Sequence, residues 1–165
     1  MPLFYFVFAD EVYGDAINAA LEKNFGDMPH VATIAEPGRG LVGDAGVIRA
    51  EVVLISEKET ASKERWVYLD IGKFSGLAET MDESIKYRLR TPHDGGETGP
   101  VCIAGNSCDS ADILYEHAGY ELPLDLAVGD YVYILATGAY TTTYSSVGFN
   151  GFPPLEGVVV GQASY

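Results

Sequence analysis

The sequence predicts a mainly β domain, of barrel or sandwich type, that begins near residue 46 and follows a short α/β unit. Two observations predict the β domain. Apolar and polar residues alternate from Val47 onward, and clusters of glycine, proline and aspartate separate the apolar runs. A third observation predicts the α/β unit, because a helical pattern is followed by a short apolar run and a glycine-rich loop. We therefore expect residues 1–45 and 46–165 to form separate structural units.

The first unit contains three predicted elements and a loop. Residues 1–9, MPLFYFVFA, are apolar but lack basic residues and are too short to span a membrane, so a buried strand is the favoured interpretation. Residues 11–25 have one apolar face and are followed by Gly26, which is typical of an amphipathic helix and its end. Residues 31–35, VATIA, predict a buried strand that leads into the loop EPGRG at 36–40.

The second unit contains six predicted strands. Residues 47–56 and 66–71 alternate in hydrophobicity on either side of a polar connection, which predicts a hairpin. In the first of these strands alternate residues share one face: Ile48, Ala50, Val52 and Leu54. Four more strands are predicted at residues 85–90, 100–104, 130–137 and 157–162, with a turn at Gly129-Asp130.

The charge distribution limits the classes of partner. The 165 residues include 24 Asp and Glu against 10 Lys and Arg, which gives a net charge of −14. All the basic residues lie between Lys23 and Arg90, so nucleic acid is not an expected partner, and no membrane association is expected either. The two cysteines are too few for a disulfide scaffold, and a reduced, cytoplasmic setting is expected.

Common catalytic signatures do not occur in the sequence. The three histidines, at positions 30, 93 and 117, are scattered and lie apart from the cysteines, so no metal site is expected. The chain has no G-x-S-x-G nucleophile turn, no G-x-G-x-x-G fingerprint and no Walker loop. Hydrolysis or nucleotide binding by those routes is therefore unsupported.

Three segments are unusual for a purely structural domain. In GNSCDSAD (105–112), Cys108 precedes Asp109 in a loop expected to enter a short helical stretch, where a thiol could exchange protons beside a carboxylate. The alternative is that Cys108 is a small buried apolar residue and Asp109 caps the helix. The segment GAYTTTYSSVGFNGF (138–152) suits either a pocket wall or a strand and turn. The loop EPGRG (36–40) presents a carboxylate and a guanidinium at a strand end, or a structural ion pair between them.

Together these segments resemble the C-terminal portion of the bacterial ornithine and lysine decarboxylases, pyridoxal-phosphate enzymes of the alanine racemase-like fold. The resemblance spans about residues 11–160. It depends on four motifs in unbroken order: EPGRGLVGDAG, WVYLDIGKFSGLAETMDE, GPVCIAGNSCDSADIL and LPLDLAVGDYVYILATGAYTTTYSSVGFNGF. It implies that residues 1–45 are the end of a cofactor-binding (β/α)₈ barrel and that residues 46–165 are the C-terminal β-barrel domain.

The resemblance also implies a role for four residues at the pyridoxal phosphate. Glu36 corresponds to the carboxylate that pairs with the pyridine nitrogen, which keeps the ring an electron sink. Gly38 and Arg39 match a loop near the cofactor phosphate, and Tyr140 matches a phenol that donates a hydrogen bond to it. The Schiff-base lysine lies upstream in the family, and none of the five lysines here has its sequence context. The chain alone is therefore expected to be incomplete.

Four further residues correspond to the substrate side of the family's site. Cys108 matches the acid that reprotonates the α-carbon, and Asp109 and Asp82 match carboxylates that hold the distal amine of a diamino acid. Phe149 falls on the aromatic wall near the substrate.

The resemblance implies decarboxylation of L-ornithine to putrescine by a homodimer whose active sites are shared across the interface. Diaminopimelate decarboxylases of the family usually carry glutamate after the cysteine, so Asp109 and the FNGF turn favour ornithine or lysine. Two alternatives stay open. The chain could be a non-catalytic dimerising or regulatory module, or it could belong to a lysine or diaminopimelate decarboxylase.

Overall fold

The computed structural model describes residues 4–28, 30, 32–34, 36, 38–58 and 64–161, with side chains from residue 12 onward. Two α-helices come first, α1 (Phe4–Phe25) and α2 (Arg39–Val42). The strands that follow are β1 (Val47–Lys58), β2 (Glu64–Leu69), β3 (Leu89–Arg90), β4 (Thr98–Pro100), β5 (Cys102–Ala104), β6 (Ile113–Tyr115), β7 (Glu121–Pro123) and β8 (Tyr131–Leu135). Short 3₁₀ segments are η1 (Gly43–Ala45), η2 (Ala78–Glu83), η3 (Thr142–Tyr144) and η4 (Phe149–Gly151).

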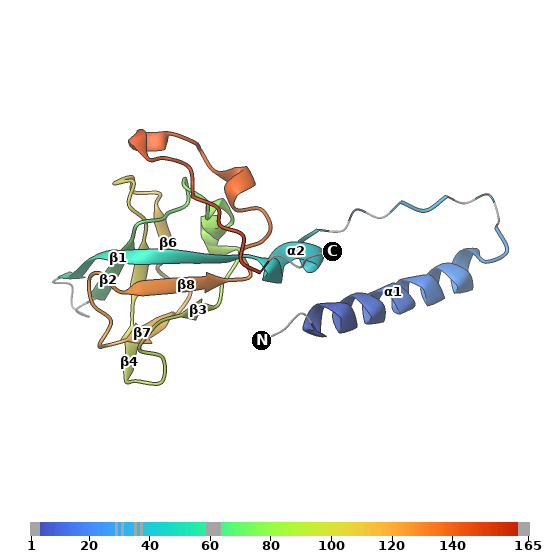
Figure 1. The fold of residues 1–165 in the computed structure, drawn as a ribbon, viewed down its shortest axis with the longest axis horizontal. Coiled ribbons are helices and arrows are strands. Elements are labelled where there is room, and N and C mark those ends of the chain that lie inside the picture. Colours follow the sequence, from blue (N-terminus) through green and yellow to red (C-terminus); the bar gives the residue numbers. More distant parts are fainter. Residues whose placement is uncertain are drawn as a thin grey trace.

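The strands form a curled six-stranded sheet in the order β3-β8-β1-β2-β5-β6, and β4 pairs separately with β7. Only β2 and β5 run parallel within the larger sheet, while its other neighbours are antiparallel. The long strand β1 lies at its centre and pairs with β8 along its first half and with β2 along its second half (Figure 1). The predicted mainly β domain and the β1–β2 hairpin are thus confirmed.

The core lies on the concave side of this sheet. Its largest fully buried side chains come from β1, β2, β5, β6, β8 and the segment after β2: Val52, Val67, Leu69, Ile71, Leu77, Ile103, Leu114, Val132 and Ile134. Of the residues predicted to share one face of β1, Ala50 and Val52 are buried, whereas Leu54 is 49% exposed. The register with β2 shifts between Val52 and Leu54, so the inward face passes from even to odd positions and Ile55 packs against the core.

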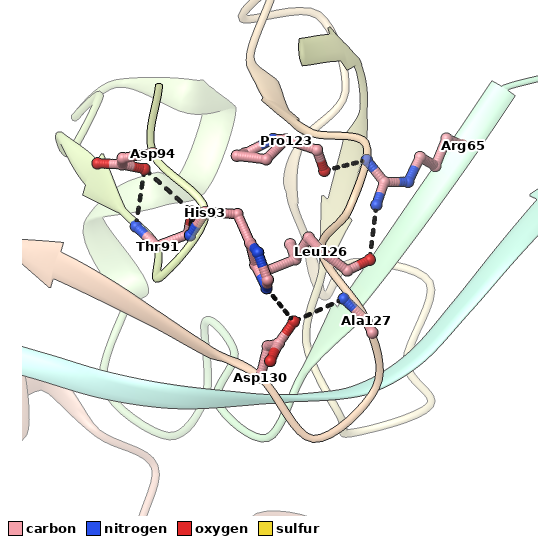
Figure 2. Close-up of polar contacts among 8 residues, drawn as sticks. All are labelled: Arg65, Thr91, His93, Asp94, Pro123, Leu126, Ala127 and Asp130. Carbon is pink, nitrogen blue, oxygen red and sulfur yellow. Dashed lines mark hydrogen bonds and ion pairs between the residues drawn. The ribbon is translucent and has the colours of Figure 1, made fainter. Parts of the chain in front are cut away.

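Polar contacts attach the β4–β7 sheet and its neighbouring turns to the larger sheet (Figure 2). Arg65 of β2 donates hydrogen bonds to the carbonyl oxygens of Pro123 and Leu126, at 2.9 and 3.0 Å. The ring of His93 lies 2.9 Å from the Asp130 carboxylate, which also accepts a hydrogen bond from the Ala127 amide at 2.8 Å. The predicted turn at Gly129-Asp130 is confirmed, with Gly129 at φ +93°.

The amino-terminal region differs most from the sequence prediction. The predicted helix over 11–25 is present, but it begins at Phe4, so the strand predicted for residues 1–9 is wrong over residues 4–9, and residues 1–3 lie outside the described part. Residues 32–34 have no regular structure, which contradicts the predicted strand there, and residues 31 and 35 are outside the described part. A strand needs a hydrogen-bonded neighbour, and the described chain pairs none with this segment. Helix α1 lies to one side of the sheet (Figure 1).

Two predicted strands in the second unit are also corrected. The strand at 85–90 is reduced to Leu89–Arg90, because the backbone at Ile85 and Tyr87 is bound to the Tyr115 hydroxyl and not to a sheet neighbour. Residues 157–161 form no strand, and the three valines at 158–160 are 77–89% exposed, while residue 162 lies outside the described part. Strands β6 and β7 were not predicted. The expected helical stretch after residue 112 is replaced by β6.

Candidate active site at one edge of the sheet

Four segments that are distant in the sequence meet at one edge of the larger sheet, on the opposite side from β4 and β7 (Figure 1). Three contacts of 2.7 Å join three of these segments. The Lys73 amide donates to Asp112, the Ser146 amide donates to the Phe74 carbonyl, and the Asn150 side chain donates to the Ser107 carbonyl. Two of the unusual sequence segments, 105–112 and 138–152, therefore lie together with the turn that follows β2.

The fourth segment, which contains α2, is attached to the chain just beyond β8. The Gly138 amide donates to the Gly43 carbonyl at 2.8 Å, and the Thr137 amide donates to the Gly46 carbonyl at 3.0 Å. The two backbones approach so closely that a Cβ atom at Gly46 or Gly138 would overlap the facing main chain. These contacts place the EPGRG loop beside the GAYT turn.

Arg39 is the centre of this contact. Its guanidinium lies between two aromatic rings, 5.6 Å from the centroid of Tyr140 and 5.9 Å from that of Tyr87, and it forms an ion pair with Glu79. It also donates to the Ala139 carbonyl at 3.3 Å. Burial lowers the pKa of Arg39, but Glu79 and Tyr87 outweigh that effect and raise the pKa above its ordinary value. The guanidinium therefore stays charged.

The phosphate-binding residues expected from the sequence are brought together. The Tyr140 hydroxyl lies 3.4 Å from the position of a Cβ atom at Gly38, and the ring of Tyr140 faces Arg39. A guanidinium and a phenol are donors suited to a phosphate, so these residues fit the phosphate end of pyridoxal phosphate. The proposed structural pair within EPGRG is wrong, because Arg39 pairs with Glu79 and Glu36 is exposed. Glu79 could not be found from sequence, since 40 residues separate it from Arg39.

An open groove with a volume of about 640 Å³ is lined in part by Tyr144, whose ring centroid lies 5.7 Å from that of Tyr140. Its charged lining is mostly acidic and comes from η2, the turn after β2 and the chain after β6: Lys73, Asp82, Glu83, Glu116 and His117. Phe74, Met81 and Tyr144 supply apolar walls. The groove thus combines the features that suit a cationic, partly aliphatic ligand.

Asp82 reaches this groove from a strained turn. Asp82 and Glu83 both adopt left-handed conformations, with φ of 51° and 53°. The Glu83 carboxylate accepts hydrogen bonds of 2.7 Å from the amides of Glu116 and His117, which holds the turn against the chain after β6. Burial raises the pKa of Glu83, but these two amides outweigh it and the pKa is lowered.

The Cys108 loop borders the same groove, because Ser110 and Ala111 line it. Cys108 is exposed and has a φ of +57°, so the alternative of a buried apolar cysteine is wrong. Asp109 is exposed and accepts a 2.8 Å hydrogen bond from the Ala111 amide, but it caps a turn and no helix follows. Cys102 is the buried cysteine, and burial raises the pKa of its thiol; both cysteines are free.

Phe149 stacks on Phe74, with ring centroids 4.2 Å apart. Both rings line a small cavity whose other lining residues are mainly serine, proline and phenylalanine. Phe149 does not line the groove itself, whereas Phe74 lines both the groove and the small cavity, so the expected role of Phe149 on an aromatic wall near the substrate stays a prediction.

Two absences complete the description. The described residues contain no group of three or more histidine, cysteine, aspartate or glutamate side chains that could hold a metal ion. Among the helices in the described part of the chain, none is long and apolar enough to cross a membrane.

Comparison with known proteins places this fold in one class, the fold-type III pyridoxal-phosphate decarboxylases. The chain belongs to this family: residues 6–138 match the family described as "Pyridoxal-dependent decarboxylase, C-terminal sheet domain". The cofactor of the family is pyridoxal phosphate.

Three relatives illustrate the similarity. A diaminopimelate decarboxylase from Staphylococcus aureus is 33% identical over 132 residues, which are 80% of this chain and 30% of the relative. A chloroplastic ornithine decarboxylase from Nicotiana glutinosa is 27% identical over 147 residues, 83% of this chain and 32% of the relative. The crystal structure of a Vibrio vulnificus lysine/ornithine decarboxylase with cadaverine is 31% identical, has a TM-score of 0.75, and matches over 90% of this chain and 39% of that one. The chain thus spans about a third of the length of these relatives.

Proposed function

We propose that this chain forms the C-terminal part of a pyridoxal-phosphate decarboxylase that acts on L-ornithine and yields putrescine and CO₂. The observation that carries the proposal is the acidic groove, where Asp82 lies beside the loop of Cys108 and Asp109. The substrate and product each carry a distal ammonium group, which a groove of net negative charge attracts. The Vibrio vulnificus relative, whose structure contains the diamine cadaverine, supports a substrate of this class.

Pyridoxal phosphate, when bound, withdraws electrons from the substrate and so allows CO₂ to leave. In this chain Gly38, Arg39 and Tyr140 would hold its phosphate, and Glu36 would pair with its pyridine nitrogen. Glu36 is exposed, so its carboxylate is accessible to a cofactor that binds beside this loop.

The remaining residues act on the substrate. Cys108 would deliver a proton to the α-carbon after CO₂ departs, since its thiol is exposed on a fixed loop at the groove. Asp109 and Asp82 would pair with the distal ammonium group, and Phe149 would support the aromatic wall through Phe74.

The domain organisation is part of the same proposal. We propose that residues 1–45 are the end of a cofactor-binding (β/α)₈ barrel and that residues 46–165 are the sheet domain. The exposed apolar residues of α1, among them Val12, Tyr13 and Ile17, fit a helix whose neighbours belong to that barrel. We propose a homodimer whose two sites meet at this groove, so that Asp82 serves the site of its own chain and the Cys108 loop completes the site of the partner.

Diaminopimelate decarboxylase is the second candidate, and the 33% identity to the Staphylococcus aureus enzyme favours it. Its substrate ends in a carboxylate as well as an ammonium group. The carboxylates lining the groove would repel that end, and Lys73 is the cation that could offset them. We therefore prefer ornithine.

A chimeric enzyme tests the proposal. The matching C-terminal part of the Vibrio vulnificus enzyme is replaced by residues 36–165 of this chain, and CO₂ release is measured with L-ornithine, L-lysine and meso-diaminopimelate. We expect the highest kcat/KM with L-ornithine, and we expect Asp109→Ala to raise its KM at least tenfold. Asp125→Ala, which removes an exposed carboxylate between β7 and β8, serves as the control. A chimera that prefers meso-diaminopimelate would contradict the proposal.

A further inference from the structure

We propose that Asp112 is a positioning residue for Cys108 and that its buried carboxylate fixes the Cys108 loop against the turn after β2. This inference rests on the proposed function of Cys108. Asp112 itself touches neither the groove nor the residues assigned to the cofactor in the described contacts, and it is 2% exposed.

The Asp112 carboxylate joins two backbone segments. One oxygen accepts a hydrogen bond from the Lys73 amide at 2.7 Å. The other accepts from the Ser107 amide at 3.1 Å and from the Ser107 hydroxyl at 2.6 Å. The residue before Cys108 and the residue before Phe74 are thereby held by a single side chain.

The fit around this carboxylate leaves no free space. A Cβ atom at either Gly72 or Gly105 would overlap the Asp112 side chain, so both glycines allow the two backbones to close around it. The main chain of Asp112 adds to the same arrangement, because its carbonyl accepts from the Gly105 amide at 2.8 Å and its amide donates to the Asp109 carbonyl at 3.0 Å. The loop from Gly105 to Asp112 is therefore closed at both ends by one residue.

Cys108 depends on this closure for its orientation. Its left-handed conformation is unfavourable for a residue with a side chain and persists only where the surroundings impose it. The Ser107 side of the loop is held by Asp112 and by Asn150, and the Asp109 side is held by the Asp112 amide. Proton delivery to a single carbon requires a donor in a fixed position, which a free loop would not provide.

The test uses the 165-residue chain without substrate or cofactor. Asp112→Asn keeps the shape of the side chain, but its NH₂ group must face a donor at Lys73 or Ser107. Two quantities are measured: amide hydrogen exchange at Lys73, Ser107 and the core residue Ile103, and the rate of Cys108 alkylation by iodoacetamide, followed by peptide mass spectrometry. Asp125→Asn, with the same change of charge at an exposed position, is the matched control.

We expect Asp112→Asn to speed exchange at Lys73 and Ser107 at least tenfold and Cys108 alkylation at least threefold, while Ile103 changes less than twofold. Alkylation at the wild-type rate would overturn the proposal even if the protein were less stable, because Asp112 would then be merely structural. If Ile103 also exchanges faster, the whole domain has been destabilised, and the milder variant Ser107→Ala is used because it removes just one of the three hydrogen bonds to the carboxylate. Cys108 alkylation at the wild-type rate in that variant would overturn the proposal too. An inactive chimera would count against the proposed function and leave these measurements unaffected.

Discussion

Replacing Tyr115 with phenylalanine should destabilise the domain far more than the loss of one oxygen atom suggests. Tyr115 is 3% exposed and packs in the core. Its hydroxyl donates to the Ile85 carbonyl at 2.7 Å and accepts from the Tyr87 amide at 3.1 Å. It therefore satisfies two backbone groups in the segment between η2 and β3, where no sheet neighbour does so.

The expected cost follows from these two groups. A buried backbone donor or acceptor left without a partner costs about 1–3 kcal/mol, so Tyr115→Phe should lower the free energy of unfolding by about 2–4 kcal/mol. For a domain of this size, a change of 1 kcal/mol shifts the melting temperature by about 4 °C, which predicts a fall of roughly 8–16 °C.

Urea and thermal unfolding followed by circular dichroism measure this change. Tyr133→Phe on β8 is the control, because its ring is half-buried and no described contact uses its hydroxyl; we expect a change within about 0.5 kcal/mol. Burial raises the pKa of Tyr115, so its protonated form stabilises the fold below the unfolded value near 10 and this contribution is lost above it. The alkaline loss should shrink in Tyr115→Phe. A variant with wild-type stability would refute the reasoning.

Three other measurements test separate features. The Ala127 amide and His93 lower the pKa of Asp130, so the stability that this carboxylate contributes should be present above its unfolded pKa and lost as the pH falls through its lower folded value; acid titration of an Asp130→Asn variant should lack that loss. In the native chain, iodoacetamide should modify exposed Cys108 at least tenfold faster than buried Cys102, and equal rates would contradict the described loop. Amide hydrogens of α1 should exchange quickly while those of β1, β2 and β8 are protected, and uniform protection would argue against the proposal that α1 belongs to the cofactor-binding barrel.

The strands predicted well from the sequence are the three longest of the described chain, β1, β2 and β8, each of which pairs with another of the three. The alternation at 47–56, 66–71 and 130–137 reports a buried and an exposed face, and these strands form the centre of the sheet. The same pattern at 85–90 and the apolar run at 157–162 failed as predictors. Alternation reports burial, whereas a strand also needs a partner with free hydrogen-bonding groups. A hydrophobic pattern with a period of two also does not reveal the bulge in β1.

For the candidate site, too, the sequence indicates some contacts and misses others. The resemblance assigns Arg39 and Tyr140 to one phosphate site, and the two side chains do lie close together, with the guanidinium 5.6 Å from the ring centroid. It could not identify Glu79 as the partner of Arg39, or Asp112 as a buried carboxylate, since an acidic residue is ordinarily expected at the surface. Long-range pairing of polar groups depends on the folded backbone, and no local pattern in the sequence encodes it.

The position of β1 between β2 and β8 has a consequence for the order in which the domain can fold. Its pairing with β2 is a local hairpin, but Val47 pairs with Leu135, at the far end of the sheet-forming region. During synthesis the first half of β1 therefore stays an open edge until β8 has emerged from the ribosome. Such an edge is a template for pairing with other chains, so translation past residue 135 marks the point at which this edge of β1 can be covered by its own partner strand.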